Sequence, residues 1–526
     1  MVSAVPTIPK PWLVQKYGGT SLGKLLGTIC TDIVPSYLQG NRVAVVCSAL
    51  SGTTKATGTT SLLLQCISLA ESSIGFLAQL HQTVDLIANN HFKVLEQHLS
   101  TADSTHTELC HETRARVSDE CESLRRYLLA AQIIGECSSR AKDRVISLGE
   151  KLASIIVAAV LAANGIPSQV IVLDDLVETV FGTDVYEQRA QFDNLYSQFY
   201  QHLAEEVGRR IRGVGNNVPV ITGFFGIMPD SLVKTVGRGY SDLCAAMCAL
   251  GIRAAELQIW KEVDGIFTAD PRKVPSARLL STVTAEEAAE LTYYGSETPL
   301  STPPSPSTTP STSTTPSPED DKIKLEQPRP TSGFMLEHGY HGERQERRIP
   351  TALTVKDAIT LVNVACNRNT TSRGFLTNVL ARVEESNATV DLVTTSERSI
   401  SLAVQAPGDA GVEEKRIEAG LEKFGKVVFT RNMSIVTVVG HKMRNMVGIA
   451  SMEAVSSLAC AKINIYLVSQ GASEISISLV VRAEDALLAM NMIHGKVLGI
   501  PTHWEQENNF IKGTYFRLVS HAGTGL

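Results

Sequence analysis

The stretch Lys16-Tyr17-Gly18-Gly19-Thr20-Ser21-Leu22-Gly23-Lys24 follows the short apolar run Trp12-Leu13-Val14, which predicts a strand that ends at a glycine-rich loop. Glycines allow backbone N–H groups to approach an anion closely, and the two lysines supply positive charge. The spacing from Gly18 to Lys24 fits a P-loop except at the last position, where Leu25 replaces the Ser or Thr that would reach magnesium. The stretch therefore predicts a phosphate-handling loop and leaves its type open.

Length and composition bound the class of protein. At 526 residues the chain exceeds what one core usually supports, so two to four domains are expected. The hydrophobic fraction of 43% is ordinary for a globular protein, and a net charge of -6 gives no basic footprint for nucleic acid. The ten cysteines show no C-x-x-C motif and no paired histidine spacing, so no metal site is predicted and a reducing compartment is expected.

No segment has the features of a signal peptide or of a membrane span. The N-terminus lacks a basic region followed by a long apolar stretch. The longest apolar run, Leu152 to Ala163, is too short to cross a bilayer and is better interpreted as part of a buried helix. These features predict a cytoplasmic protein.

Apolar runs alternate with helical patterns as far as residue 297, which predicts a largely parallel α/β sheet. Ser48 to Lys55 follows one predicted strand and is rich in hydroxyl groups, and ligands of such sheets lie beyond the carboxyl ends of the strands. Val236 to Asp242 opens a helix with Gly, Arg, Ser and Asp, and Arg238 could bind a carboxylate there. Strands are predicted at 43–47, 169–173, 218–222 and 257–260, and helices at 22–38, from about 62 to 161 and at 243–250.

The pattern then changes twice. From Thr298 to Pro318 every residue except Leu300 is Ser, Thr or Pro, and this composition predicts a disordered linker that we extend to residue 349. Beyond it, two similar units occur, each predicted as β-α-β-β-α, a small ferredoxin-like module. Neither module carries catalytic-looking side chains, so ligand sensing is expected of them. The predicted strands are 360–364, 390–397 and 399–404 in the first module and 435–439, 463–468 and 475–481 in the second.

Nine segments occur in an order that resembles the aspartate kinase family, most closely its fungal type. They are KYGGTS, SALSGTTKATGTT, SLGE, GFFG, VGRGYSD, the segment ending DGIFTADPR, LTYYGSE, VDLVTTSE and VSQGASEISIS. The resemblance implies an amino-acid kinase (carbamate kinase-like) fold, a three-layer αβα domain, followed by two ferredoxin-like ACT domains, and it argues against a P-loop. The implied boundaries are 10–297 for the kinase domain, 298–349 for the linker, 350–430 and 431–505 for the ACT domains, and 506–526 for a C-terminal tail.

The resemblance also implies roles for individual residues. Lys16 and Asp242 would be catalytic, with Lys16 neutralising the transferred phosphoryl group and Asp242 orienting Lys16. The implied substrate-binding residues are Ser48, Thr54, Glu150 for the ammonium group, Phe224, Arg238 for the α-carboxylate, and Ser241. The implied nucleotide-binding residues are Gly18, Gly19, Thr20, Lys261, Glu262, Phe267 and Arg272. The residues implied near an effector pocket are Thr395, Ser396, Gln470 and Ala472.

The implied reaction is transfer of the γ-phosphoryl group of ATP, with Mg²⁺, to the β-carboxylate of L-aspartate, giving 4-phospho-L-aspartate. No general base is needed, because the attacking carboxylate is already ionised near neutral pH. The family further implies a homo-oligomer built through the ACT domains and an inhibitory amino acid, threonine in fungal relatives. The product would supply threonine and methionine synthesis or a specialised metabolite such as a picolinic acid of the fusaric acid type.

The sequence departs from the family pattern after LTYYGSE. Relatives continue into a helix and a final strand, whereas here Thr298-Pro299 opens the linker. Tyr240 also stands where a smaller residue is usual, and Lys261-Glu262 replaces a Thr-Asp pair. Two alternatives therefore stay open: a catalytically impaired regulatory partner that senses threonine, and a kinase of another amino acid.

Overall fold

The computed structural model describes residues 10–52, 57–72, 77–99, 104–135, 137–195, 197–229, 231–232, 239–261, 265–280, 282–294, 334–337, 350–366, 375–386, 388–396, 399–405, 410–440, 443, 447–500 and 515–519. The chain forms two compact units. The first comprises Met1–Asp264 with Lys512–Leu526, and the second comprises Gly265–Ile511.

A parallel sheet forms the centre of the first unit. Its strands are β1 (Trp12–Tyr17), β2 (Arg42–Cys47), β3 (Ser168–Ile171), β4 (Val218–Thr222) and β5 (Glu256–Trp260). They lie in the order β3-β4-β2-β1-β5, and every neighbouring pair is parallel. A further strand, β14 (Tyr515–Val519), pairs antiparallel with β5. The parallel α/β sheet expected from the sequence is confirmed.

Successive residues of the central strands enter two different cores. In β2, Val43 and Val45 belong to one apolar cluster, whereas Ala44 and Val46 belong to another. Neighbouring side chains of a strand point to opposite faces, so both faces of the sheet are covered. This double burial explains why β2 consists of apolar residues throughout after Arg42, instead of alternating with polar ones.

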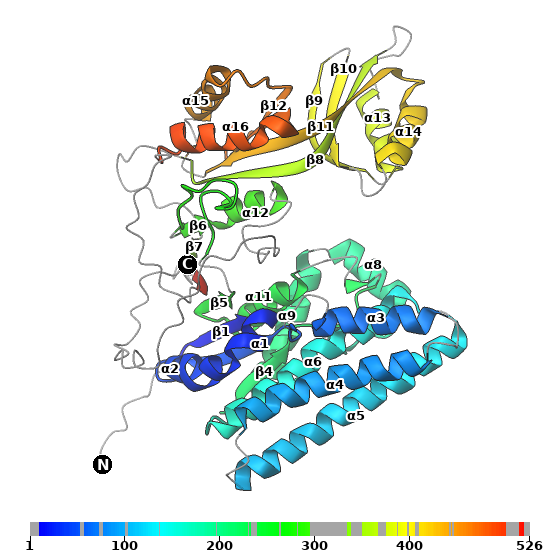
Figure 1. Cartoon of the computed structure of the whole chain (residues 1–526), viewed down its shortest axis with the longest axis vertical. Helices are drawn as coiled ribbons and strands as arrows, with labels where there is room; N and C mark the ends of the chain where they lie inside the picture. Colours follow the sequence, from blue (N-terminus) through cyan, green and yellow to red (C-terminus); the bar gives the residue numbers. More distant parts are fainter. Residues whose placement is uncertain are drawn as a thin grey trace, which may run out of the picture. The chain divides into compact units, whose positions relative to one another are not determined.

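Helices form the two outer layers, which completes the predicted three-layer αβα arrangement. Helices α3, α4, α5 and α6 pack together (Figure 1). With α1 they contribute to one apolar cluster, while α7, α9 and α11 contribute to the other. The helices are α1 (Gly19–Thr28), α2 (Val34–Leu38), α3 (Thr59–Glu71), α4 (Leu77–His98), α5 (Ser104–Ile134), α6 (Ser139–Ala163), α7 (Leu176–Phe181), α8 (Val185–Leu195), α9 (Ser197–Gly213) and α11 (Tyr240–Ile252).

The predicted helix from residue 22 to 38 is divided into three pieces. A π-helical turn, Ile29–Ile33, separates α1 from α2. Pro35 lies in the first turn of α2 and has no N–H to offer the carbonyl of Thr31, so regular α-helical bonding cannot continue through this point. Helix α1 also begins earlier than expected, directly after the extended residue Gly18.

Helix α6 is longer than the apolar run that identifies it in the sequence. Its 25 residues are long and apolar enough to cross a membrane by length and composition, but 89% of its most apolar window is buried inside the first unit. Its residues Leu152, Ile156 and Val160 all belong to the cluster that covers one face of the sheet. The interpretation as a buried core helix is therefore confirmed.

An antiparallel sheet dominates the second unit. Its strands are β8 (Ala352–Cys366), β9 (Thr389–Thr395), β10 (Ser399–Gln405), β11 (Gly425–Val439), β12 (Leu467–Gln470) and β13 (Ser476–Arg482), in the order β12-β13-β11-β8-β10-β9. Helices α13 (Phe375–Glu384) and α14 (Ala410–Leu421) belong to one module, and α15 (Val447–Cys460) and α16 (Ala483–Lys496) to the other. The two predicted ferredoxin-like modules are confirmed.

The two central strands are shared by both modules. The first part of β8, from Ala352, pairs with the last part of β11, and the remainder of β8 pairs with the first part of β11. The register shifts where one module passes into the other. Ala358 and Asn432 have positive φ values of 59° and 57° at this point, so both strands are bulged there.

The predicted strand 463–468 begins later, at Leu467. Helix α15 ends in a turn in which Ile463 N donates to the carbonyl of Leu458 at 3.0 Å, and Lys462 has a φ of 57°. This is the left-handed ending common to α-helices, so the apolar Ile463 closes the helix instead of opening a strand.

Three further elements of the second unit lie in or near the predicted linker. Strand β6 (Thr282–Thr284) leads into α12 (Ala285–Tyr294), and β7 (Phe334–Glu337) pairs parallel with β6. The rest of the predicted linker between residues 298 and 349 lies outside the described residues.

Candidate active site

The carboxyl ends of four strands meet at one edge of the parallel sheet. Gly18 N donates to the carbonyl of Trp260 at 3.3 Å, Ser48 N to that of Tyr17 at 3.2 Å, and Gly223 N to that of Cys47 at 2.9 Å. These bonds continue the sheet beyond its strands and hold β1, β2, β4 and β5 together where their loops begin. In parallel α/β sheets this edge is the usual place for a ligand.

Gly19 permits the closest approach between two of these loops. A Cβ atom at this position would lie 2.1 Å from the carbonyl oxygen of Ala49, closer than any side chain can come to backbone. Ser51 N also donates to the carbonyl of Gly19 at 3.1 Å. The glycine, which is the first residue of α1, therefore keeps the end of β1 and the start of α1 against the loop after β2.

Two lysines flank one carboxylate at this edge. Lys16 Nζ lies 2.5 Å from Asp242 Oδ1, and Lys261 Nζ donates to Asp242 Oδ2 at 3.1 Å. Lys16 is the second-last residue of β1, Lys261 directly follows β5, and Asp242 lies in the first turn of α11. Asp242 and Lys261 lie 226 and 245 positions after Lys16 in the sequence. The three residues thus form one cluster with a net positive charge.

Burial and charge act against each other in this cluster. Burial lowers the pKa of Lys16, while the Asp242 carboxylate acts to raise it. Burial acts to raise the pKa of Asp242, but Lys16 and Lys261 outweigh it and hold that pKa below its ordinary value. Asp242 is therefore anionic near neutral pH, and only its charge makes two ammonium groups tolerable at such short range.

A second group of polar side chains lies around Glu150, which is 2% exposed in α6. Tyr240 Oη donates to Glu150 Oε1 at 2.5 Å, and the ring of Tyr240 meets that of Phe224 edge to face at 6.2 Å between centroids. Burial is the main reason why the pKa of Glu150 rises to about 7. Ser48 Oγ and Ser241 Oγ lie 2.9 Å apart, which ties the loop after β2 to α11.

The first turn of α11 joins the two groups. Its three consecutive residues Tyr240, Ser241 and Asp242 contact Glu150, Ser48 and the two lysines respectively. Gly239 precedes them with a φ of 97°, a conformation that favours glycine. One helix end therefore lies between a cluster of two lysines and a buried carboxylate.

The structure brings together most of the site residues predicted in the first unit. The contacts described above link seven of them: Lys16, Ser48, Glu150, Phe224, Ser241, Asp242 and Lys261. Three more, Gly18, Gly19 and Thr20, form the start of α1 and the residue before it. Thr54, Arg238 and Glu262 lie outside the described residues. Tyr240 is the contact residue that the sequence does not assign, and its only signal there is its position directly before Ser241-Asp242.

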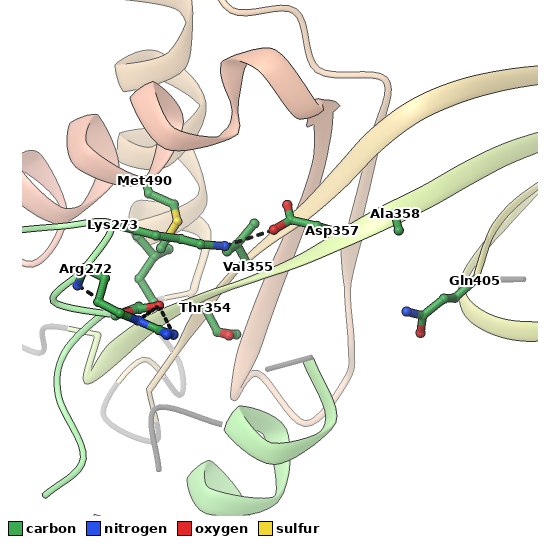
Figure 2. Close-up of a pocket in the computed structure, with 10 residues that line it drawn as sticks. Arg272, Lys273, Thr354, Val355, Asp357, Ala358, Gln405 and Met490 are labelled. Atoms are coloured by element: carbon green, nitrogen blue, oxygen red, sulfur yellow. Dashed lines mark hydrogen bonds and ion pairs between the residues drawn. The ribbon is translucent and has the colours of Figure 1, made fainter. Parts of the chain in front are cut away.

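The remaining predicted nucleotide residues, Phe267 and Arg272, belong to the second unit. Phe267 forms an isolated antiparallel bridge with Leu279. The Arg272 guanidinium is held by Asp270, with Nη2 2.8 Å from Oδ2. Figure 2 shows Arg272 and Lys273 beside β8, where they line a pocket of about 400 Å³, and Lys273 Nζ donates to Asp357 Oδ2 at 2.9 Å.

The predicted effector residues lie on two strands that approach each other. Thr395 ends β9 and Gln470 ends β12; Ser396 and Ala472 follow closely, and all four are exposed. Leu392 of β9 and Leu467 of β12 share one apolar cluster. Beneath this region, Asp391 of β9 forms a buried ion pair with Lys356 of β8, with 2.6 Å between Nζ and Oδ1.

Comparison with known proteins identifies the family. The amino acid kinase family matches residues 11–301, and an ACT domain family matches residues 436–497. The aspartokinase of Candida albicans is 39% identical over 511 residues, which cover 93% of this chain and 90% of the relative. The chain belongs to the aspartokinase family. The resemblance inferred from the nine sequence segments is thereby confirmed.

Other aspartokinases support this membership. That of Schizosaccharomyces pombe is 39% identical over 516 residues, covering 93% of each chain. The aspartate kinase FUB3 of Gibberella fujikuroi is 33% identical over 512 residues, covering 92% of this chain and 97% of the relative. The crystal structure of Escherichia coli aspartokinase III in complex with aspartate and ADP has a similar fold, with a TM-score of 0.61 at 22% identity, over 92% of this chain and 99% of the other.

Proposed function

We propose that this aspartokinase transfers the γ-phosphoryl group of ATP to the β-carboxylate of L-aspartate, giving 4-phospho-L-aspartate and ADP. The observation that carries the proposal is the first turn of α11. It joins a Lys16–Asp242–Lys261 cluster suited to phosphate with a buried carboxylate suited to an ammonium group. Aspartate kinase chemistry needs both features side by side.

The lysine cluster supports the phosphoryl-transfer part of the proposal. In the reaction an oxygen of the substrate carboxylate attacks the γ-phosphorus, and the bond to the β,γ-bridging oxygen breaks with its electron pair leaving on ADP. Such transfer depends mainly on positioning and on neutralising charge. Lys16, held in place by Asp242, would contact the transferred group, and Lys261 would add a second positive charge nearby.

The group around Glu150 supports an amino-acid substrate. A buried carboxylate with one oxygen that has no hydrogen-bond partner in the described part of the chain is a good acceptor for an ammonium group. Ser48 and Ser241 offer hydroxyl groups at the same helix end, and Phe224, which packs on Tyr240, would line the substrate pocket. Thr54 and Arg238 would complete this pocket, with Arg238 binding the α-carboxylate.

ATP would enter as its magnesium complex. Among the described residues, no group of three or more His, Cys, Asp and Glu side chains converges, and Asp242 is already engaged by two lysines. The donor set therefore fits a Mg²⁺ ion that is carried by the nucleotide phosphates, the usual arrangement for this ion in kinases. Gly18, Gly19 and Thr20 would line the phosphates, and Glu262 would contribute to the nucleotide site.

The ACT modules would make the enzyme responsive to an amino acid. We propose threonine as the effector, with Thr395, Ser396, Gln470 and Ala472 near its site, and a homo-oligomer assembled through the same modules in the cytoplasm. The E. coli aspartokinase III structure of the T-state is a complex with lysine and aspartate. Lysine is therefore the alternative effector.

A hydroxamate assay on the purified full-length protein tests the proposal. With ATP, Mg²⁺ and L-aspartate, the protein should form aspartyl hydroxamate, and L-glutamate in place of aspartate should give little product. Threonine should inhibit the reaction, and lysine at the same concentration should not.

Three results would each point elsewhere. Product from glutamate but not from aspartate would indicate a kinase of another amino acid. Threonine binding by calorimetry without any hydroxamate would indicate a regulatory partner. Inhibition by lysine and not by threonine would support the kinase activity and would show that lysine, not threonine, is the effector.

A further inference from the structure

Tyr240 is fixed against the carboxylate of Glu150 from several sides. Its hydroxyl donates to Oε1 at 2.5 Å. Its ring packs edge to face on Phe224, which is itself buried. Because Tyr240 is the first residue of α11 and follows Gly239 in the left-handed conformation, its backbone is also held by the helix end.

The second oxygen of the same carboxylate is left open. Glu150 Oε2 is buried and has no hydrogen-bond partner among the described residues. A buried polar atom without a partner costs free energy, and an oxygen of a carboxylate costs more than a neutral one. A ligand that brings a cationic donor to Oε2 would remove this cost.

We propose that Tyr240 is a positioning residue for substrate binding: by holding Oε1 of Glu150, it fixes the carboxylate so that Oε2 accepts the α-ammonium group of the amino-acid substrate. The inference rests on the proposed function and adds how the site distinguishes an amino dicarboxylate from one without an amino group. Succinate has both carboxylates of aspartate but no ammonium group, so it cannot satisfy Oε2.

The charges around Glu150 make the tyrosine hydroxyl important. The titratable groups that act on Glu150 are Lys16 from β1, Cys47 from β2, Asp174 from the loop after β3, and Tyr240 and Cys244 from α11. Burial raises the pKa of Glu150, and the bond from Tyr240 acts to lower it. Without that bond the carboxyl group would hold its proton to higher pH and would bind an ammonium group less well.

The variant Tyr240→Phe tests the inference, because it removes one hydroxyl and keeps the ring on Phe224. In the full-length protein we expect the KM for aspartate to rise roughly tenfold, as for loss of a hydrogen bond to a charged group, with kcat and the KM for ATP within about twofold. The acid limb of the pH profile of kcat/KM for aspartate should move to higher pH. Binding of succinate, measured by calorimetry, should be unchanged.

A double-mutant cycle separates positioning from a structural role. In a Glu150→Gln background, Tyr240→Phe should have no further effect on aspartate binding, because its partner is already altered. Tyr17→Phe is the matched control: it removes another buried hydroxyl, one that donates to Gln15 Oε1 at 3.0 Å, and should leave the KM for aspartate unchanged. Equal losses in both backgrounds, or an unchanged KM and pH profile in Tyr240→Phe, would overturn the inference.

The experiments distinguish a failure of this inference from a failure of the proposed function. An active wild-type protein with an unaffected Tyr240→Phe variant overturns this inference alone. An inactive wild-type protein that binds aspartate overturns the proposed catalysis, and the inference is then supported or overturned by whether Tyr240→Phe weakens that binding. A wild-type protein that neither binds nor phosphorylates aspartate overturns both.

Discussion

Lys16 Nζ lies 2.5 Å from Asp242 Oδ1, and the other oxygen of the same carboxylate accepts a hydrogen bond from Lys261. One carboxylate thus fixes two ammonium groups on the edge of the sheet where the loops meet. The formal charge of the cluster is +1, so in the proposed function a phosphate would bind it without displacing Asp242. The two lysines should nevertheless contribute differently, because Lys16 is 4% exposed within β1 and Lys261 lies at a loop entrance.

Replacing Lys16 with Met should mainly reduce turnover. Its charge would act on the phosphoryl group in transfer, and losing one such stabilising group lowers kcat by roughly 10²–10³-fold. The KM for aspartate should change little. Steady-state hydroxamate kinetics measure both. Lys142→Met, which removes a half-exposed lysine paired with Glu71, serves as control and should keep kcat within about twofold. A wild-type kcat in Lys16→Met would contradict the assignment.

Replacing Lys261 with Met should mainly weaken nucleotide binding. Lys261 contacts Asp242 from the loop after β5, so its charge would be felt by the ATP phosphates more than by aspartate. We expect the KM for ATP to rise by about tenfold, which corresponds to about 1.4 kcal/mol. Initial rates over a range of both substrates distinguish the two KM values. An effect confined to the KM for aspartate would indicate that Lys261 acts on the aspartate site and not on the nucleotide site.

Glu150 should make the stability of the protein depend on pH. Its pKa rises from 4.5 to about 7 in the folded state, so between these values the folded protein binds the proton more tightly than the unfolded chain does. The stabilisation is present below about pH 4.5 and is lost as pH rises through about 7. The loss is on the order of 3 kcal/mol at most.

The variant Glu150→Gln should lack this pH dependence. The free energy of unfolding can be measured with urea at about pH 5 and about pH 8. Relative to wild type, the variant should be more stable at the higher pH than at the lower pH. If the free energies of unfolding of the two proteins changed with pH in the same way, Glu150 would not titrate in this range.

The buried ion pair of Lys356 and Asp391 should be sensitive to single substitutions. Their side chains are 8% and 0% exposed, and Asp391 Oδ2 has no hydrogen-bond partner among the described residues. Lys356→Met leaves a buried charge without its counter-ion, which typically costs about 3–5 kcal/mol. Adding Asp391→Leu should restore most of that loss.

Urea unfolding with a domain-specific probe measures these differences. The matched control is Lys273→Met, because Lys273 pairs with Asp357 at the surface, where both side chains are more than a third exposed. Its cost should stay below about 1 kcal/mol. A cost for Lys356→Met as small as that of the control would show that the pair is not effectively buried.

Much of the first unit could be predicted from the sequence, because β2 and β4 are mainly apolar and are followed directly by Ser48 and Gly223. The strands at 43–47 and 218–222 and the loops that follow them are recognisable in this way. The contact of Tyr240 with Glu150 could not be predicted, since the two residues are 90 positions apart and no local pattern relates them. Lys261 could be assigned to a nucleotide segment from the sequence. Its contact with Asp242 could not be predicted, for the same reason.

The second unit shows the limit of local patterns more clearly. The β-α-β-β-α order of each module is visible in the sequence, because each element has its own periodicity. The pairing between β8 and β11 depends on residues about 60 to 90 positions apart, and it decides which half of each strand belongs to which module. The strand boundary at Leu467 depends similarly on how α15 ends.

The sharing of β8 and β11 also determines how this sensor can be re-engineered. Neither module can be cut out at a loop, because each long strand begins in one module and finishes in the other. A chimaera that exchanges one effector specificity for another must either replace the pair as a whole or join the parent sequences inside both strands, at the bulges of Ala358 and Asn432. Effector specificity in this chain is therefore transferable only as a two-module cassette, unless both junctions are changed together.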